Sequence, residues 1–198
     1  MIRMAVFVSG GGTNLQALLD SENPYGKIAL VVASNPRAYA IERARQAGIP
    51  ALVFQRKKLG EAYSAQLLAA LSEHQIDLIV LAGFLTILDE AVIAAYPRRI
   101  LNIHPSLLPA FGGVGFYGIK VHEAALARGV KVTGATVHFV NEVPDGGEII
   151  AQRAVEVLPG DTPETLQRRV MEQAEWRILP DVVRNQCKTM EEDPSWKA

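Results

Sequence analysis

A carboxamide and an imidazole stand two residues apart in this sequence, as Asn102 and His104 at the end of an apolar run. If residues 100–103 form a strand, the two side chains point to the same face of the sheet. Pro105 has no backbone N–H, so we expect the strand to end there. A carboxamide donates hydrogen bonds to a developing oxyanion, and an imidazole moves a proton near neutral pH. A histidine at a strand end is often only structural, but the neighbouring carboxamide favours a catalytic site.

Asp145, which is followed by two glycines, is the third candidate for chemistry. Asp before Gly is the ordinary composition of a turn, and for these three residues alone this structural interpretation is the stronger one. The functional alternative is a carboxylate that orients His104 and receives a proton, as the third group of a catalytic triad does.

A glycine-rich segment, residues 9–14, has the sequence Ser-Gly-Gly-Gly-Thr-Asn and lies between a predicted strand and a predicted helix. Backbone N–H groups at the start of a helix bind anions, and glycines let a ligand approach closely. A dinucleotide fingerprint needs glycine where Leu15 stands, and a P-loop needs a Gly-Lys pair that this segment lacks. The segment therefore suits a monophosphate, with a tight structural turn as the equally weighted alternative.

Glu175 lies on or near the apolar face of a predicted helix, beside Met171, Ile178 and Val182. A carboxylate at such a position is unfavourable unless it is paired or contacts a ligand. The alternative is that its side chain reaches out to solvent. We expect no metal site, because the four histidines are not closely paired in the sequence and one cysteine cannot build a structural zinc site.

Composition and charge narrow the class of protein. The chain has 198 residues, 49% of them hydrophobic and 21% charged, which indicates a globular protein rather than a disordered one. A net charge of −1 offers no basic excess for nucleic acid. The single cysteine, Cys187, excludes an internal disulfide and fits a reducing compartment. The first apolar run, residues 4–8, is too short for a signal peptide or a membrane span. We expect a cytoplasmic protein that binds neither nucleic acid nor a membrane.

The elements that would position these residues alternate over the first hundred positions. Apolar runs predict strands at residues 2–8, 28–33, 51–54, 78–82 and 100–103. Helical spacing of apolar residues predicts helices at residues 14–19, 40–47, 61–73 and 89–95. Because strand and helix alternate four times, we expect an α/β domain with a doubly wound, mostly parallel sheet flanked by helices.

The second half of the chain has a different pattern. Residues 111–118 are rich in glycine and show no period, which predicts a loop before a helix at residues 120–127. Apolar and polar residues alternate in residues 133–140 and 149–157, which predicts two strands. The short turn between them favours neighbouring strands of opposite direction, and so an antiparallel strand near the C-terminal end.

A last helix is predicted from a capping Thr162 and from Pro163 at its first position, with apolar residues every four positions. These apolar residues are Leu166, Val170, Ala174, Ile178 and Val182. We expect one domain, residues 1–189, and a polar, frayed tail, residues 190–198.

These sites occur together in one known family. The chain resembles the phosphoribosylglycinamide formyltransferases, folate-dependent enzymes of purine synthesis. The resemblance is carried by SGGGTNL (residues 9–15), VLAGFLTIL (80–88), LNIHPSLLP (101–109), GATVHFV (134–140), DGG (145–147) and GDT (160–162). The Asn-x-His-Pro-Ser-Leu-Leu-Pro stretch ahead of Asp145 is specific for formyl-folate enzymes. The first loop and the chain length narrow the resemblance to the glycinamide ribonucleotide branch.

The resemblance implies a reaction in which 10-formyltetrahydrofolate, as co-substrate, gives its formyl group to the amine of glycinamide ribonucleotide, with no metal. The amine would attack the formyl carbon directly. Asn102 and His104 would face the oxyanion that forms. Asp145 would hold His104 and take the proton of the amine, through a water molecule.

The resemblance also implies the binding residues. The substrate phosphate would lie on Gly11, Gly12, Thr13 and Asn14, and the ribose hydroxyls on Glu175. The folate would lie against Phe84, Leu85, Thr86, Ile87 and Leu88, and its pterin would meet Val140, Asn141, Glu142 and Asp145. Both partners would be small molecules, and the protein a monomer or a homodimer.

The chain departs from the family pattern at a few positions. Thr86 and Gly60 stand at or near positions where relatives carry Arg, which leaves the binding of the folate tail open. Trp176 stands where His is common, and residues 111–118 form a longer loop than in several relatives, either a mobile flap or merely a longer connection.

Three other functions fit part of the pattern. A methionyl-tRNA formyltransferase would have a further tRNA-binding domain and a basic charge balance. A formyltetrahydrofolate hydrolase would use water instead of an amine and would carry a further regulatory domain. A non-catalytic folate- or nucleotide-binding module would not need Asn102, His104 and Asp145 together.

Overall fold

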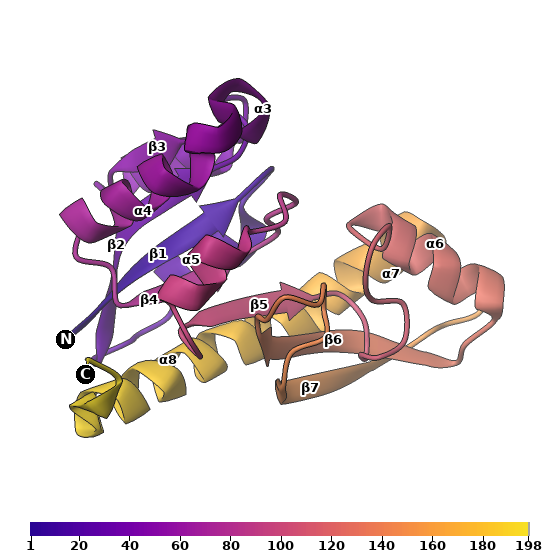
Figure 1. Cartoon of the computed structure of the whole chain (residues 1–198). Helices are drawn as coiled ribbons and strands as arrows, with labels where there is room; N and C mark the ends of the chain where they lie inside the picture. Colours follow the sequence, from indigo (N-terminus) through magenta and orange to yellow (C-terminus); the bar gives the residue numbers. More distant parts are fainter. Residues whose placement is uncertain (198) are drawn as a thin grey trace.

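The computed structural model describes residues 1–197, which form a seven-stranded sheet with helices on both faces (Figure 1). The strands are β1 (Ile2–Val8), β2 (Gly26–Ala33), β3 (Ala51–Val53), β4 (Leu78–Leu81), β5 (Ile100–His104), β6 (Val132–Phe139) and β7 (Ile149–Glu156). Their order across the sheet is β3-β2-β1-β4-β5-β6-β7. Strands β1 to β5 pair in parallel, whereas β6 is antiparallel to both of its neighbours. The predicted doubly wound, mostly parallel sheet and its antiparallel strand are therefore confirmed.

Helices connect the strands. Within the described residues the α-helices are α1 (Thr13–Leu19), α2 (Ala40–Gln46), α3 (Arg56–Leu59), α4 (Tyr63–Glu73), α5 (Glu90–Ala95), α6 (Ile119–Arg128), α7 (Pro163–Val170) and α8 (Trp176–Glu192). The short helix α3 and the 3-10 turn after it, η1 (Gly60–Ala62), were not predicted, because four residues are too few to show a helical period. Among residues 1–197, no helix is both long enough and apolar enough to cross a membrane.

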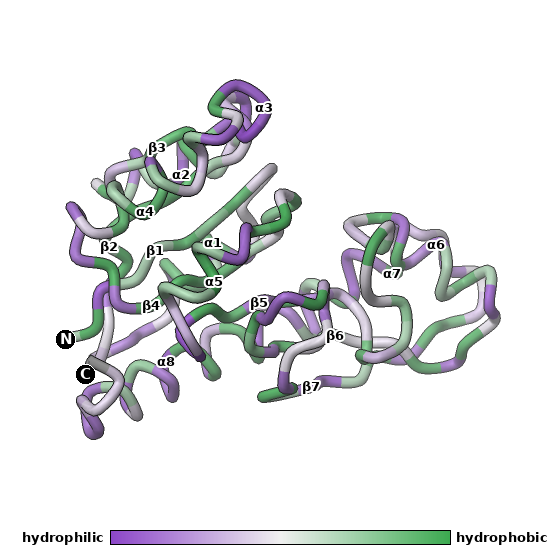
Figure 2. The backbone as a smooth tube through the Cα atoms, viewed as in Figure 1, coloured by the Kyte–Doolittle hydropathy of each residue, from purple (hydrophilic) through white to green (hydrophobic). Residues whose placement is uncertain are grey.

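Alternate side chains of β1 pack on opposite faces of the sheet, as the period of two in a strand requires. Val6 and Val8 lie in one apolar cluster with Leu179 of α8, whereas Phe7 lies in the other with Leu67 of α4. Figure 2 shows that the central strands are among the most apolar parts of the backbone. Because both faces are covered, residues 4–8 of β1 and all of β4 are continuously apolar.

The last helical region begins as predicted but is not one straight helix. Thr162 Oγ1 accepts a hydrogen bond from the Thr165 backbone N–H, and Thr165 Oγ1 accepts one from the Thr162 N–H, over 3.3 and 2.9 Å. After α7, a single wide turn of π-helix, η2 (Met171–Glu175), precedes α8. A π-turn shifts the faces of the two helices relative to each other and is frequent at functional sites.

The end of the chain is more ordered than expected. Helix α8 continues to Glu192, and a 3-10 turn, η3 (Pro194–Lys197), follows. Met190 is buried, and its carbonyl oxygen accepts a hydrogen bond from the Trp196 indole over 2.7 Å. The tail that was predicted to fray from residue 190 is therefore helical up to Glu192 and again from Pro194 to Lys197. Residue 198 lies outside the described residues.

The strand order reverses at β1 and β4, since the chain proceeds from β1 toward β3 and then returns to β4 on the other side. Ligands of doubly wound sheets bind at the carboxyl ends of the strands at such a point. Here the segments after β1 and β4 are joined: the Ser9 N–H donates to the Gly83 carbonyl over 3.1 Å, and the Leu85 N–H donates to Ser9 Oγ over 2.9 Å. The glycine-rich loop and the residues after β4 therefore form one edge.

Candidate active site

A cavity of about 860 Å³ opens at this edge of the sheet. The segments that line it follow β1, β4, β5 and β6, and further lining residues come from the 113–118 loop and from α7 and η2. All of the predicted site residues except Gly12 line this cavity. The structure thus brings together residues that the sequence separates widely.

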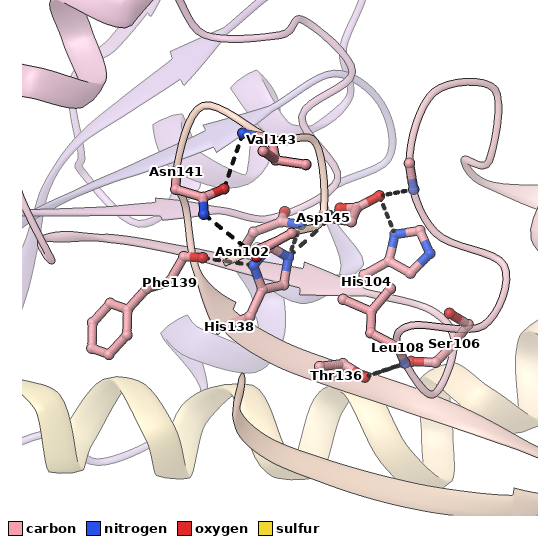
Figure 3. Close-up of polar contacts among 12 residues, drawn as sticks. Asn102, His104, Ser106, Leu108, Thr136, His138, Phe139, Asn141, Val143 and Asp145 are labelled. Carbon is pink, nitrogen blue, oxygen red and sulfur yellow. Dashed lines mark hydrogen bonds and ion pairs between the residues drawn. The ribbon is translucent and has the colours of Figure 1, made fainter. Parts of the chain in front are cut away.

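The pairing of β5 with β6 builds the centre of the site (Figure 3). Asn102 is the register partner of His138, so their side chains lie on the same face. Asn102 Nδ2 lies 3.0 Å from His138 Nε2 and 3.3 Å from Asp145 Oδ1. The predicted trio is therefore a quartet, because His138 also contacts the carboxamide.

Asp145 is both a turn residue and a member of the site. Its φ of 55° is left-handed, and the Gly146 N–H closes the turn on the Val143 carbonyl over 2.9 Å. The turn directs the carboxylate toward the loop on the other side of the cavity, where the Gly113 N–H donates to Oδ2 over 2.9 Å. Burial opposes the carboxylate and the hydrogen bond from the Gly113 N–H favours it, and the pKa of Asp145 lies below its usual value.

His104 is buried, and both of its ring nitrogens face protein acceptors. Nε2 lies 2.8 Å from the Phe111 carbonyl oxygen, and Nδ1 lies 3.4 Å from Asp145 Oδ2. Burial lowers the pKa of His104, and the opposing effects of Asp145 and the Phe111 carbonyl do not restore it. His104 is therefore neutral at pH 7, with its proton on Nε2.

These contacts direct the N–H donors of Asn102 and His104 at protein acceptors. The sequence predicted that Asn102 and His104 would direct N–H groups at a ligand oxygen. Instead, both N–H groups of Asn102 are directed at His138 and Asp145, and the Nε2–H of His104 is directed at Phe111. The reason is that the strand register and the 111–118 loop provide protein acceptors that were not evident from the sequence.

The glycine-rich loop forms the end of the cavity beside β1. Gly12 has a φ of +71°, and a Cβ there would lie 2.6 Å from the Ala40 Cβ, so Gly12 shapes the turn from behind the cavity wall. Arg43 Nε donates to the Gly11 carbonyl over 2.8 Å and fixes the loop to α2. Thr13 and Asn14, at the start of α1, line the cavity.

Glu175, the last residue of η2, is 6% exposed and lines the cavity, so the alternative that it reaches out to solvent is wrong. Its Oε2 accepts a hydrogen bond from Asn14 Nδ2 over 2.6 Å. Burial raises the pKa of Glu175, and the Asn14 hydrogen bond opposes this shift.

The segment after β4 is an apolar wall. Leu85 and Ile87 are 58% and 62% exposed, whereas Leu88 is buried and Phe84 packs edge-on against Phe7 at 5.1 Å between ring centroids. Arg56 holds this wall from outside, since its Nη1 donates to the Ile87 carbonyl over 2.7 Å. Exposed apolar side chains beside a cavity fit a flat aromatic ligand. Thr86 lies in the same wall, and Val140, Asn141 and Glu142 line the same cavity.

Comparison with known proteins decides the family. Residues 2–183 match the model of the formyl transferase family. The chain belongs to the formyl transferase family. The resemblance seen in the motifs is therefore confirmed. Among residues 1–197 of this formyltransferase, no group of three or more His, Cys, Asp or Glu side chains is placed to hold a metal ion.

Individual relatives are similar over most of the chain. The phosphoribosylglycinamide formyltransferase of Bacillus subtilis is 40% identical, over 93% of this chain and 94% of its own. A chloroplastic phosphoribosylglycinamide formyltransferase of Arabidopsis thaliana is 42% identical, over 98% of this chain and 68% of its own. The crystal structure of glycinamide ribonucleotide transformylase 1 from Symbiobacterium toebii has 44% identity and a TM-score of 0.89, and covers 96% of this chain and 89% of that one. The chain spans only 13% to 18% of the trifunctional purine biosynthetic proteins of animals that it matches.

Proposed function

We propose that this formyltransferase moves the formyl group of 10-formyltetrahydrofolate to the amino group of glycinamide ribonucleotide. The convergence of Asn102, His104 and Asp145 on one cavity carries the proposal. The same cavity includes a glycine-rich loop suited to a phosphate and an apolar wall suited to a folate. The names of the bacterial and plant relatives support this substrate pair.

The chemistry is a direct displacement. The amine attacks the formyl carbon, a bond from that carbon to the amine nitrogen forms, and its bond to the folate nitrogen breaks. The amine loses one proton and the folate nitrogen gains one. Because a positioned amine is already a competent nucleophile, no covalent enzyme intermediate is needed, and proximity supplies much of the rate.

The two ionisable residues have separate roles in this mechanism. Asp145, whose low pKa keeps it ionised at pH 7, receives the proton of the amine through a water molecule. His104 donates its Nε2–H to the formyl oxygen after exchanging the Phe111 carbonyl for the substrate. Removal of one such donor lowers the rate by about 10²–10³-fold in other enzymes.

Binding is divided between the two ends of the cavity. Gly11, Thr13 and Asn14 hold the phosphate on a turn that Gly12 shapes, and Glu175 accepts hydrogen bonds from the ribose hydroxyls. The folate lies against the wall after β4 and meets the segment after β6. Its contacts are Phe84, Leu85, Thr86, Ile87, Leu88, Val140, Asn141, Glu142 and Asp145.

The remaining features of the proposal concern partners and compartment. We propose a cytoplasmic enzyme, monomeric or homodimeric, whose partners are these two small molecules and neither nucleic acid nor a membrane. The net charge of −1 supports this, since it gives no overall attraction to polyanions.

An acceptor comparison tests the function. The purified protein is incubated with 10-formyltetrahydrofolate and, in turn, with glycinamide ribonucleotide, charged initiator tRNA or buffer alone, and deformylated folate is measured. We expect turnover only with the nucleotide, and a His104→Ala control should lose rate far more than nucleotide affinity. Turnover with tRNA or with water alone would select a methionyl-tRNA formyltransferase or a hydrolase. Folate binding without turnover would select a binding module.

A further inference from the structure

The hydrogen bonds of His138 determine which atom of Asn102 faces the cavity (Figure 3). His138 Nδ1 lies 2.7 Å from the Phe139 carbonyl oxygen, which can only accept a hydrogen bond. Nδ1 therefore carries a proton, and in a neutral imidazole Nε2 is then a bare acceptor. The Asn102 atom 3.0 Å from Nε2 must be a donor, and so it is the amide nitrogen.

The second N–H of the same amide is directed at Asp145. Asn102 Nδ2 lies 3.3 Å from Asp145 Oδ1, and an ionised carboxylate also only accepts. An Asn side chain has two N–H donors and one carbonyl oxygen. Because both donors are directed at protein acceptors, Oδ1 is the polar atom of Asn102 that remains for a ligand in the cavity.

The opposite orientation does not fit the same distances. A proton on His138 Nε2 would need the Asn102 oxygen opposite it, and that oxygen would then lie 3.3 Å from Asp145 Oδ1, acceptor against acceptor. His138 Nε2 is 3.6 Å from Asp145 Oδ1, which is too long for a hydrogen bond to replace the one that is lost. With a neutral ring and a bare Nε2, both N–H groups of Asn102 and the Nδ1–H of His138 are directed at acceptors.

We infer that His138 is a positioning residue that holds the Asn102 oxygen toward the attacking amine. This role rests on the proposed function and changes the expected role of Asn102, which accepts a hydrogen bond from the amine rather than donating one to the oxyanion. An N–H bound to Asn102 Oδ1 aims the nitrogen lone pair at the formyl carbon. The bond strengthens as the nitrogen becomes positive during the attack.

Nuclear magnetic resonance of the full chain without substrates tests the orientation. The ¹⁵N shifts of His138 show which ring nitrogen carries the proton, and we expect Nδ1. The side-chain NH₂ of Asn102 should exchange slowly with water, and faster in His138→Phe, which removes the acceptor. A proton on Nε2, or exchange that is the same in both proteins, would overturn the inference. This result is independent of the substrate, so it stands apart from the test of the proposed function.

Kinetics of three substitutions at the same position test the consequence. The oxygen of Gln can occupy the place of the ring Nε2, whereas that of Asn can occupy only the place of Nδ1. We expect His138→Phe and His138→Asn to lower kcat by about 10²-fold with both KM values within about threefold, and His138→Gln to recover about tenfold of that loss. If Gln is as slow as Phe, or if only KM changes, the positioning role is wrong.

Discussion

Asn14 and Glu175 connect the first and last helical regions of the chain at the wall of the cavity. Asn14 Nδ2 donates to Glu175 Oε2 over 2.6 Å, and both residues are buried. Asn14 Oδ1 is buried without a hydrogen-bond partner in the described part of the chain. Buried acceptors beside a cavity are satisfied when a ligand supplies donors, and ribose hydroxyls are such donors.

Replacing Glu175 by Gln tests this assignment. Gln keeps the shape of the side chain and can still accept from Asn14, but it has one acceptor oxygen fewer for the ribose hydroxyls. We expect the KM for glycinamide ribonucleotide to rise about tenfold while kcat changes less than about twofold. Steady-state kinetics with saturating folate measure both values. An unchanged nucleotide KM would show that Glu175 does not bind the substrate.

The same substitution should change how stability depends on pH. The pKa of Glu175 is raised above 4.5 in the folded protein, so just above this pH the folded state binds more protons than the unfolded state. The wild-type free energy of unfolding therefore loses this contribution as pH rises through the folded pKa. Glu175→Gln does not titrate, so its stability relative to the wild type should increase over the same window. Urea unfolding at several pH values measures the difference, and a difference that does not vary with pH would contradict the prediction.

Substitutions at two glycines of the first loop distinguish a role in folding from a role in substrate binding. Gly12→Ala forces a side chain into a left-handed conformation and against Ala40, so we expect it to lose at least about 1–2 kcal/mol of stability. A Cβ at Gly11 would meet no atom within 4 Å, and Gly11→Ala should leave stability unchanged. If this backbone holds the phosphate, Gly11→Ala still raises the nucleotide KM. Urea unfolding measures the stability of both variants, and steady-state kinetics measure their nucleotide KM. A Gly11→Ala variant with the KM of the wild type would exclude phosphate contact at that residue.

Features that depend on neighbouring residues were predictable from the sequence. The apolar runs identified the strands, Thr162 and Pro163 located the start of α7, and the spacing of Asn102 and His104 placed them on one face. Each of these depends on local backbone preferences or on the period of a single element.

The rest of the site depends on contacts that carry no local signal. His138 belongs to an alternating strand, but only its register with β5 places it opposite Asn102. Repeats of four residues predicted a continuous helix, whereas a π-turn turns Glu175 inward. The acceptor for the Nε2–H of His104 is the backbone carbonyl of Phe111. Because every residue has a backbone carbonyl, the sequence could not single out this one. Tertiary packing decides all three.

The apolar wall offers a test of folate binding that does not disturb folding. Leu85 is 58% exposed and lines the cavity, so Leu85→Ser should raise the KM for 10-formyltetrahydrofolate about tenfold. Its stability should stay within about 0.5 kcal/mol of the wild type, as for other surface substitutions. Leu158→Ser is the matched control, since Leu158 is 42% exposed and does not line the cavity. Equal effects of the two substitutions on the folate KM would argue against this wall as the folate site.

The coupling of His104 to Asp145 predicts the acid side of the pH–rate profile. Burial holds the pKa of His104 below 6.5, and the nearby Asp145 carboxylate limits this shift. Protonated His104 would donate a second N–H to Asp145 and occupy the carboxylate that receives the proton of the amine. We therefore expect kcat/KM to fall with decreasing pH through a midpoint below 6.5, and the His104 ring to titrate at the same midpoint by nuclear magnetic resonance. In Asp145→Asn the ring should titrate at a still lower pH, because the charge that favours the imidazolium is gone. A midpoint above 6.5 in the wild type would show that the carboxylate and not burial dominates at this imidazole, and an upward shift in the variant would show that the carboxylate does not favour the imidazolium.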